Sequence, residues 1–187
     1  RKALAIAPGA TVQLATTIPG AKTLKTAKKS NDLAEKMRQE GCEFLVAAPH
    51  SGGIDRDTRP IAEHLYEEVS RFGVDASLYI MAGFGKASFK RWHIRSRNIH
   101  PASYPKFRDV ARRRYEYTVS IHGHTEDHIT VGGTASEDVR KAVRRGLENT
   151  LTKTTAGEVT VYHQHEKSKN SGHTGHNFVN WLRDGKK

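Results

Sequence analysis

The chain of 187 residues carries 31 Lys or Arg and 20 Asp or Glu, so its formal net charge at neutral pH is +11. This length corresponds to one domain, and a chain of this size with 36% hydrophobic residues can form a core, which excludes wholesale disorder. The single cysteine, Cys42, cannot form an intrachain disulfide, and no stretch approaches the roughly 20 apolar residues of a membrane helix. We therefore expect a soluble protein without a membrane partner.

The excess of positive charge favours an acidic partner, which could be nucleic acid, an anionic membrane surface or an acidic polymer. The alternative is a solvated basic surface without any partner, because charge alone does not identify one. The choice between these interpretations depends on motifs along the chain.

The N-terminal residues 1–28 are rich in small residues and Thr, and Pro and Gly interrupt any regular pattern. We expect an irregular arm there, with at most one short edge strand over Val12–Thr17. Residues 29–187 are expected to form a single domain. It begins with a predicted helix that Asn31 caps and Gly41 ends, with Leu33, Ala34 and Met37 on one face.

The following elements alternate between strands and helices. We expect a strand over Glu43–Ala48, followed by a helix that ends near Gly73 and has Ile61, Leu65 and Val69 on one face. A strand over Ser77–Met81, a long loop over 83–106 and a strand over Tyr115–Ile121 come next. A short strand or turn over Thr130–Gly133, a helix from a capping box at Thr134–Glu137 to Leu151, a strand over Glu158–Tyr162 and a helix over Asn177–Leu182 follow. This alternation predicts an α/β fold with an open mixed sheet flanked by helices.

Two histidines and one aspartate occupy positions typical of a ligand site. His50 follows the first buried strand and His122 follows the alternating strand, and in open α/β sheets ligands bind beyond the carboxyl ends of strands. Asp55 lies five residues after His50, across two glycines, and can fold back toward it. Two imidazoles and one carboxylate form the ligand set of a catalytic zinc, which keeps a fourth position open. The alternative is that these histidines have no function and are ordinary surface residues of a basic protein.

Five segments in the same order resemble the phage poly-γ-glutamate hydrolase family. They are the Ala-Pro-His segment Ala48–Thr58, Trp92–Asn98, the Ser-Ile-His-Gly of Ser120–Gly123, Val131–Gly133 and Asn177–Asn180. The resemblance implies a single-domain fold similar to zinc carboxypeptidases, with His50, Asp55 and His122 as zinc ligands. It also implies a protein that cleaves the γ-amide bonds of poly-γ-glutamate. The compartment stays open, with secretion and release by phage lysis as the two alternatives.

The chain departs from the family pattern at two positions of the first segment. Asp55 replaces the usual Glu, so its carboxylate is one methylene shorter, and either the loop moves in or the metal is held more weakly. Ser51 replaces a Gly, which would cost stability if that position required a positive φ. We expect the outer nitrogens of the ligand histidines to bind Asp57, Ser120, Glu116 or a backbone carbonyl.

The resemblance also indicates residues for substrate. His93 is either a wall of the site or a structural loop histidine, and Arg95 and Arg97 are either a clamp for substrate carboxylates or solvated loop cations. Asn177 and Asn180 either hold substrate or cap the last helix.

The general base expected for a zinc amidohydrolase is missing from its family context. In the family this acid lies in a Gln-Leu-Glu segment after the Asn-rich helix, and here the sequence stops at Lys187. We expect either a truncated chain or a member with little activity, with Glu126, Asp127 and Glu166 as possible substitutes. A rival metal site would use the histidines of the last strand and the segment after it, which are His163, His165, His173 and His176.

Two functions are therefore compared. The first is a monomeric zinc-dependent hydrolase of poly-γ-glutamate. The second is a non-catalytic nucleic-acid-binding module that uses the clusters Arg112–Arg114 and Arg140–Arg145. The ordered segments and the low aromatic content of 7% favour the hydrolase, because single-stranded nucleic acids are usually bound by stacking rings.

Overall fold

The computed structural model describes residues 31–39, 41–95, 99, 104–126, 128–151, 158–161, 172, 177, 179–180 and 182. The predicted arm over 1–28 lies outside these residues. The chain divides into two compact units, Arg1–His124 with Trp181–Lys187 and Thr125–Asn180, and each is described by itself. The expectation that 29–187 form a single domain stays a prediction.

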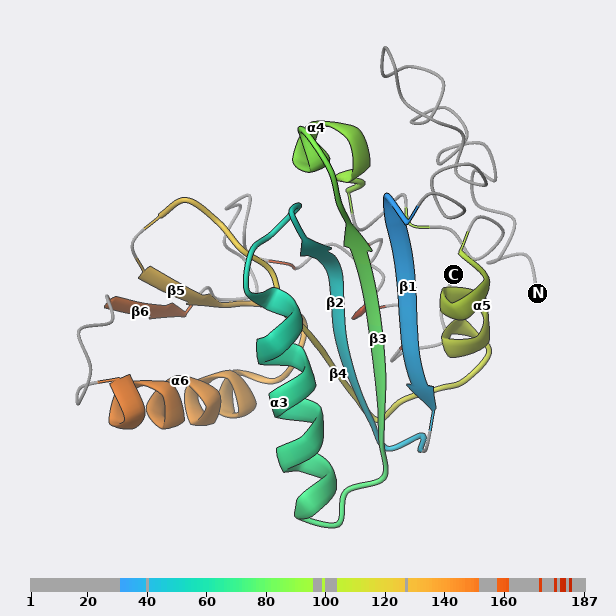
Figure 1. Cartoon of the computed structure of the whole chain (residues 1–187). Coiled ribbons are helices and arrows are strands. Elements are labelled where there is room, and N and C mark those ends of the chain that lie inside the picture. Colours follow the sequence, from blue (N-terminus) through green and yellow to red (C-terminus); the bar gives the residue numbers. More distant parts are fainter. Residues whose placement is uncertain are drawn as a thin grey trace. The chain divides into compact units, whose positions relative to one another are not determined.

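The first unit is built on a mixed four-stranded sheet in the order β1-β3-β2-β4 (Figure 1). Strand β2 pairs in parallel with both β3 and β4, and β1 runs antiparallel to β3 at one edge. The open mixed sheet and the three predicted strands of this unit are confirmed. The strands are β1 (Leu33–Gln39), β2 (Phe44–Gly52), β3 (Ala76–Gly83) and β4 (Tyr117–Ser120).

The predicted helix between Asn31 and Gly41 is wrong, because this segment forms edge strand β1. Its Leu, Ala, Glu, Lys, Met and Arg residues are good helix formers, but pairing with β3 overrides that weak propensity. Alternate side chains serve opposite faces of the strand. Lys36 binds Glu63 of the next helix at 2.6 Å, while Glu35 accepts a hydrogen bond from the hydroxyl of Tyr79.

Helix α3 (Thr58–Arg71) covers one face of this sheet (Figure 1), as predicted, and ends just before Gly73. The core between helix and sheet consists of Val46, Ala48, Ala62, Tyr66, Ala76, Leu78, Ile80 and Ala82. The buried stripe of α3 is rotated from the predicted one. Ile61 is 52% exposed, and the neighbouring Ala62 is buried in its place.

Two short helices occupy parts of the segment predicted as a loop over 83–106. Helix α4 (Ser88–Trp92) follows β3, and α5 (Pro105–Ala111) begins at the end of the segment, with Pro105 in its first turn. Their sequences are too short to give a helical period. Among the described residues, no helix is both long and apolar enough to cross a bilayer.

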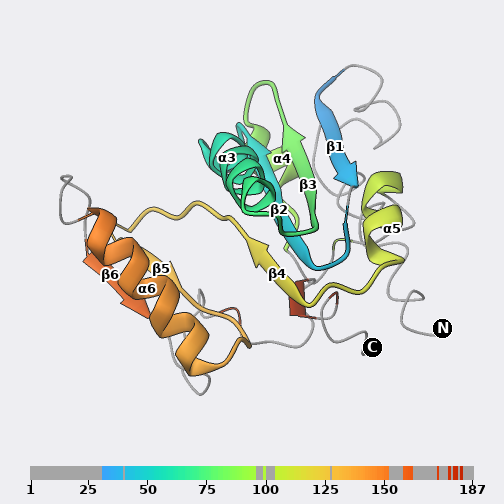
Figure 2. The same cartoon turned by 90° about the horizontal axis from the view of Figure 1, so that it is seen from below.

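The second unit contains the parallel strands β5 (His128–Val131) and β6 (Glu158–Val161), with helix α6 (Glu137–Leu151) packed against them (Figure 2). The two strands and the helix were predicted, but the prediction that Thr134 caps the helix through a capping box at Thr134–Glu137 is wrong. Ser136 caps α6, because its hydroxyl accepts the backbone N–H of Val139. Thr134 donates instead to the side-chain oxygen of Asn180.

Replacing Leu78 with Ala tests the core of the first unit. Leu78 is fully buried on β3, so its truncation is expected to lower the free energy of unfolding by about 2–5 kcal/mol in urea titrations. Phe72→Ala is the control, since Phe72 is 82% exposed and its loss should change that free energy by less than about 0.5 kcal/mol. Equal effects of the two substitutions would contradict this core.

Candidate metal centre

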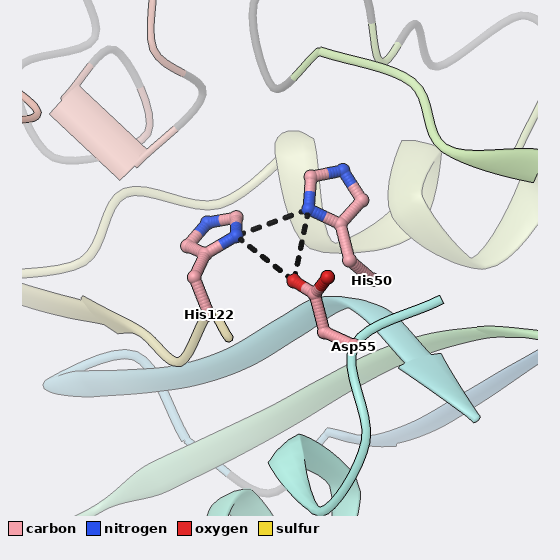
Figure 3. Close-up of side chains that lie close together, drawn as sticks. All are labelled: His50, Asp55 and His122. Carbon is pink, nitrogen blue, oxygen red and sulfur yellow. Dashed lines mark hydrogen bonds and ion pairs between the residues drawn. The ribbon is translucent and has the colours of Figure 1, made fainter. Parts of the chain in front are cut away.

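Three donor atoms from His50, Asp55 and His122 converge at the carboxyl edge of the main sheet (Figure 3). The Nδ1 atoms of the two histidines are 3.0 Å apart, and each lies 3.8 Å from Oδ2 of Asp55. The parallel pairing of β2 with β4 produces this proximity, because it ends both strands at one edge. Their register continues past β4 through the hydrogen bond from Ile121 N–H to the carbonyl of Ala47.

A β-bulge in β2 lies at His50. Between Ala48 and Ser51, β2 advances three residues while β3 advances two, so one residue of β2 is extra. Pro49 falls inside this irregularity, where its missing N–H breaks no regular ladder bond. Bulges redirect side chains and are common beside active sites. His50 remains buried, with only 2% of its surface exposed.

Asp55 reaches the histidines through a tight turn after β2. Its backbone N–H donates to the carbonyl of His50 at 2.6 Å, so the predicted folding back of this segment is confirmed. Gly52 permits the turn with a φ of +74°, and Thr58 closes it by donating to the carbonyl of Asp55. Ser51 is not strained, since its φ is not positive, and its buried hydroxyl binds that of Thr58.

The outer nitrogens of both histidines have partners within the first unit. Nε2 of His50 donates to the carbonyl of Ile94, and Nε2 of His122 lies 2.9 Å from the hydroxyl of Ser120. A carbonyl can only accept, so neutral His50 carries its proton on Nε2 and directs the Nδ1 lone pair at the cluster. The Ser120 hydroxyl can hold His122 in the same tautomer. Of the predicted partners, Ser120 and a backbone carbonyl are thus the ones found in hydrogen bonds with these rings.

The electrostatics keep the donors in the state that binds a cation. Burial, reinforced by the His122 and His93 rings, lowers the pKa of His50 to about 3, against the opposing effects of the Ile94 carbonyl and Asp55. Burial would raise the pKa of Asp55, but the His122 ring and the Gly123 N–H outweigh it and lower that pKa below its usual value. At neutral pH His50 is therefore neutral and Asp55 is ionised.

The cluster fits a metal ion both in size and in chemistry. A point about 2.1 Å from all three donor atoms exists between them, and this is the usual length of zinc–nitrogen and zinc–oxygen bonds. In the tautomer with the protons on both outer nitrogens, the two Nδ1 lone pairs and the Asp55 carboxylate can all face one cation. In the other tautomer of His122, its Nδ1–H faces His50 and Asp55, and a bound cation would displace that proton. His50, Asp55 and His122 are therefore the described residues that could hold a divalent metal.

The predicted substrate residues fall at several places. The His93 ring lies 4.5 Å from that of His50, between centroids, and stacks on Phe89, which places it beside the cluster, while its role as a wall of the site stays a prediction. Burial lowers the pKa of His93, assisted by His122 and Arg95 and opposed by Asp55. Arg95 is exposed, and Arg97 lies outside the described residues.

Asn177 and Asn180 belong to the second unit. The side-chain oxygen of Asn177 accepts the N–H of Val179, which is the geometry of a helix cap. Asn180 is 5% exposed; its amide donates to the carbonyl of Gly172 and accepts from Thr134. Both side chains therefore have structural contacts within their own unit, and a role toward substrate stays a prediction.

The proposed substitutes for the general base are only partly described. Glu126, in the second unit, pairs with His128 at 3.1 Å, while Asp127 and Glu166 lie outside the described residues. The rival metal site also falls outside them, since His163, His165, His173 and His176 are not described.

Three backbone and hydroxyl groups at the cluster were not identified from the sequence, which allowed for a backbone carbonyl but did not say which one. The carbonyl of Ile94 and the N–H of Gly123, which donates to Oδ2 of Asp55 at 3.1 Å, are main-chain groups that every residue type carries. The third is the hydroxyl of Thr58, which is 2% exposed. The position of Thr58 at the end of the family-like segment Ala48–Thr58 was the one sequence feature that could have indicated its role.

Comparison with known proteins gives the family. Residues 21–186 match the model of a family described as poly-gamma-glutamate hydrolase. The chain belongs to this family. Membership agrees with the five ordered segments read from the sequence, which include the histidines and the aspartate of the cluster.

Two curated proteins of Bacillus subtilis strain 168 are similar in sequence to this chain. The chain is 29% identical to YndL over 134 residues and 31% identical to the prophage-derived YoqZ over 99 residues, covering 68% and 52% of this chain. It spans about half the length of YndL (49%) and about a third of that of YoqZ (32%).

Two solved structures share the fold of this poly-gamma-glutamate hydrolase family member. A zinc-free apo structure of YndL has a TM-score of 0.62 at 23% identity, and a bacteriophage poly-gamma-glutamate hydrolase has one of 0.65 at 19% identity. Each comparison covers 84% of this chain and about 70% of the other chain (70% and 69%).

Replacing Gly52 with Ala tests the turn that carries Asp55. A Cβ there would lie 2.7 Å from the carbonyl oxygen of Gly83 at a left-handed φ, so the turn must shift. We expect zinc affinity, measured by chelator competition, to fall roughly 10- to 100-fold, as for other groups that orient ligands. Gly73→Ala is the matched control, because Gly73 also has a left-handed φ but no atom within 4 Å of the added Cβ. Equal zinc affinities in the two variants would argue against this role of Gly52.

Proposed function

We propose that this protein is a zinc-dependent hydrolase that cleaves the γ-glutamyl amide bonds of poly-γ-glutamate. The observation that carries the proposal is the convergence of His50, Asp55 and His122, with two oriented imidazoles and one ionised carboxylate. Family membership and the name of the bacteriophage relative support the substrate.

The residues around the proposed zinc site have two roles, which are to orient its ligands and to form one of its walls. Bound zinc supplies Lewis-acid chemistry, which activates water and polarises an amide carbonyl. Ile94 and Ser120 orient the two imidazoles, and the Gly123 N–H fixes the Asp55 carboxylate. The stacked rings of His93 and Phe89 form one wall, which shields the His50 side of the cluster from water.

Several described cations in the two segments that follow β2 and β3 have no ion-pair partner. They are Arg56 after β2, and Lys86, Lys90 of helix α4 and Arg95 after β3. Both segments leave the carboxyl edge of parallel strands. Most of the other described cations of this unit pair with acidic side chains, namely Lys36, Arg38, Arg59, Arg71, Arg91, Arg108 and Arg112. Free positive charge at this edge suits a substrate that carries a carboxylate on every residue.

The zinc content of the purified protein tests the proposed site. We expect about one zinc per chain, as in a three-ligand catalytic site, and loss of stoichiometric zinc in His122→Ala. His64→Ala is the matched control, since His64 is exposed on α3 and should leave the zinc content unchanged. Unchanged zinc in His122→Ala would exclude this residue as a ligand.

Polymer binding tests the role of the unpaired cations. An exposed cation–carboxylate contact contributes about 1 kcal/mol at 4 Å, so the loss of two such contacts in Lys90→Gln/Arg95→Gln should weaken poly-γ-glutamate binding roughly 30-fold at low salt. Added salt should weaken the binding of the unaltered protein, because exposed charges are screened. The control Arg112→Gln/Arg114→Gln makes the same charge change before the amino end of β4 and should bind nearly normally.

The same measurements separate the hydrolase from the nucleic-acid-binding alternative. Tight DNA binding at physiological salt that is lost in Arg112→Gln/Arg114→Gln, without response to poly-γ-glutamate, would contradict the proposal. The field of the +11 charge should otherwise give only weak DNA binding without sequence preference.

A further inference from the structure

Asp32, the residue before β1, binds two points of the segment that follows β3. Its carbonyl accepts a hydrogen bond from the N–H of Phe84 at 2.8 Å. Its carboxylate Oδ2 accepts a hydrogen bond from Nη2 of Arg91 at 3.3 Å. Both charged side chains are only 19% exposed, so water screens this ion pair less than an exposed one. The two bonds hold the start of the segment and helix α4 against the edge strand.

Trp92 holds the same segment against the sheet. Its side chain is 3% exposed, and its Nε1 donates to the carbonyl of Phe84 at 3.3 Å. A Cβ added to Gly83 would lie 2.8 Å from Cβ of Trp92, so the end of β3 and the indole are in close contact. The guanidinium of Arg91 lies over the indole, 4.8 Å from its centroid, which links the ion pair to this contact.

Two residues beyond Trp92, the chain reaches the metal cluster. The carbonyl of Ile94, a residue 3% exposed, accepts Nε2–H of His50. This carbonyl determines which nitrogen of His50 carries the proton, and therefore whether the Nδ1 lone pair is directed at Asp55 and His122. Its position follows from the attachment of Arg91 and Trp92, because only one residue separates Trp92 from Ile94.

We propose that Asp32 and Arg91 are positioning residues for His50, acting through Trp92 and the Ile94 carbonyl. The inference rests on the proposed zinc site. The ion pair fixes the segment over 84–95, the segment fixes the carbonyl, and the carbonyl holds His50 in the tautomer that presents Nδ1. Neither Asp32 nor Arg91 touches the cluster itself.

Zinc affinity of ion-pair variants tests this chain of contacts. Asp32→Asn and Arg91→Gln each remove the charge attraction with little change in volume, and we expect either to weaken zinc binding roughly 10- to 100-fold. The double variant should lose much less affinity than the sum of the two single losses, because both substitutions break the same ion pair. Lys36→Gln is the matched control, since it breaks a different ion pair, between Lys36 of β1 and Glu63 of α3, and should leave zinc affinity unchanged.

The tautomer of His50 in the zinc-free protein provides a readout that a general loss of stability would not change. Long-range ¹H–¹⁵N NMR, assigned with His50→Gln, should give the Nε2–H form in the unaltered protein and in Lys36→Gln. Asp32→Asn and Arg91→Gln should give a mixture with the Nδ1–H form.

The outcomes separate this inference from the proposed function. Unchanged His50 tautomer and unchanged zinc affinity in both ion-pair variants, or fully additive losses in the double variant, would overturn the inference. If the unaltered protein binds no zinc, the proposed function fails, and the NMR comparison alone decides whether Asp32 and Arg91 position His50.

Discussion

The parallel pairing of β2 with both β3 and β4 is the constraint on which the site depends. It ends three strands at one edge of the sheet, so the residues that follow them meet there. His50 lies on β2 itself, Asp55 lies on the turn after β2, and His122 lies two residues beyond the end of β4. The segment after β3 adds the Ile94 carbonyl. A sheet of the same residues with antiparallel neighbours would separate these groups by the length of a strand.

A second constraint is the tight path from His50 to Asp55. Aspartate is one methylene shorter than the glutamate usual in the family, and the Asp55 N–H is bonded directly to the carbonyl of His50. Gly52, Ser51 and Thr58 shape this turn by a left-handed φ and by hydroxyl contacts. The loop places Oδ2 of Asp55 3.8 Å from Nδ1 of each histidine, while the choice between the two sequence alternatives, a loop that moves in or a metal held more weakly, stays a prediction.

Much of the fold was predictable because strong local patterns coincide with the tertiary structure. The continuous apolar run of β2 and the helix between Thr58 and Arg71 are such cases. Strand β1 was missed because its residues favour a helix in isolation and only pairing with β3 makes it a strand. Helix α4 was missed because five residues are too few to show a period.

The candidate site divides in the same way between side chains and backbone. His50, Asp55 and His122 could be found because imidazoles and carboxylates are distinctive and lie in segments that resemble the family. The Ile94 carbonyl, the Gly123 N–H and the bulge at His50 could not, because main-chain groups carry no sequence signal until the strands are paired. The ion pair of Asp32 with Arg91 joins residues far apart in the chain for the same reason.

The location of bound zinc is the most direct test of the account. In a crystal of the zinc-loaded protein, data collected on both sides of the zinc absorption edge should give one anomalous peak between Nδ1 of His50, Nδ1 of His122 and Oδ2 of Asp55, at about 2.0–2.2 Å from each. A peak among His163, His165, His173 and His176, with none at this edge of the sheet, would contradict it.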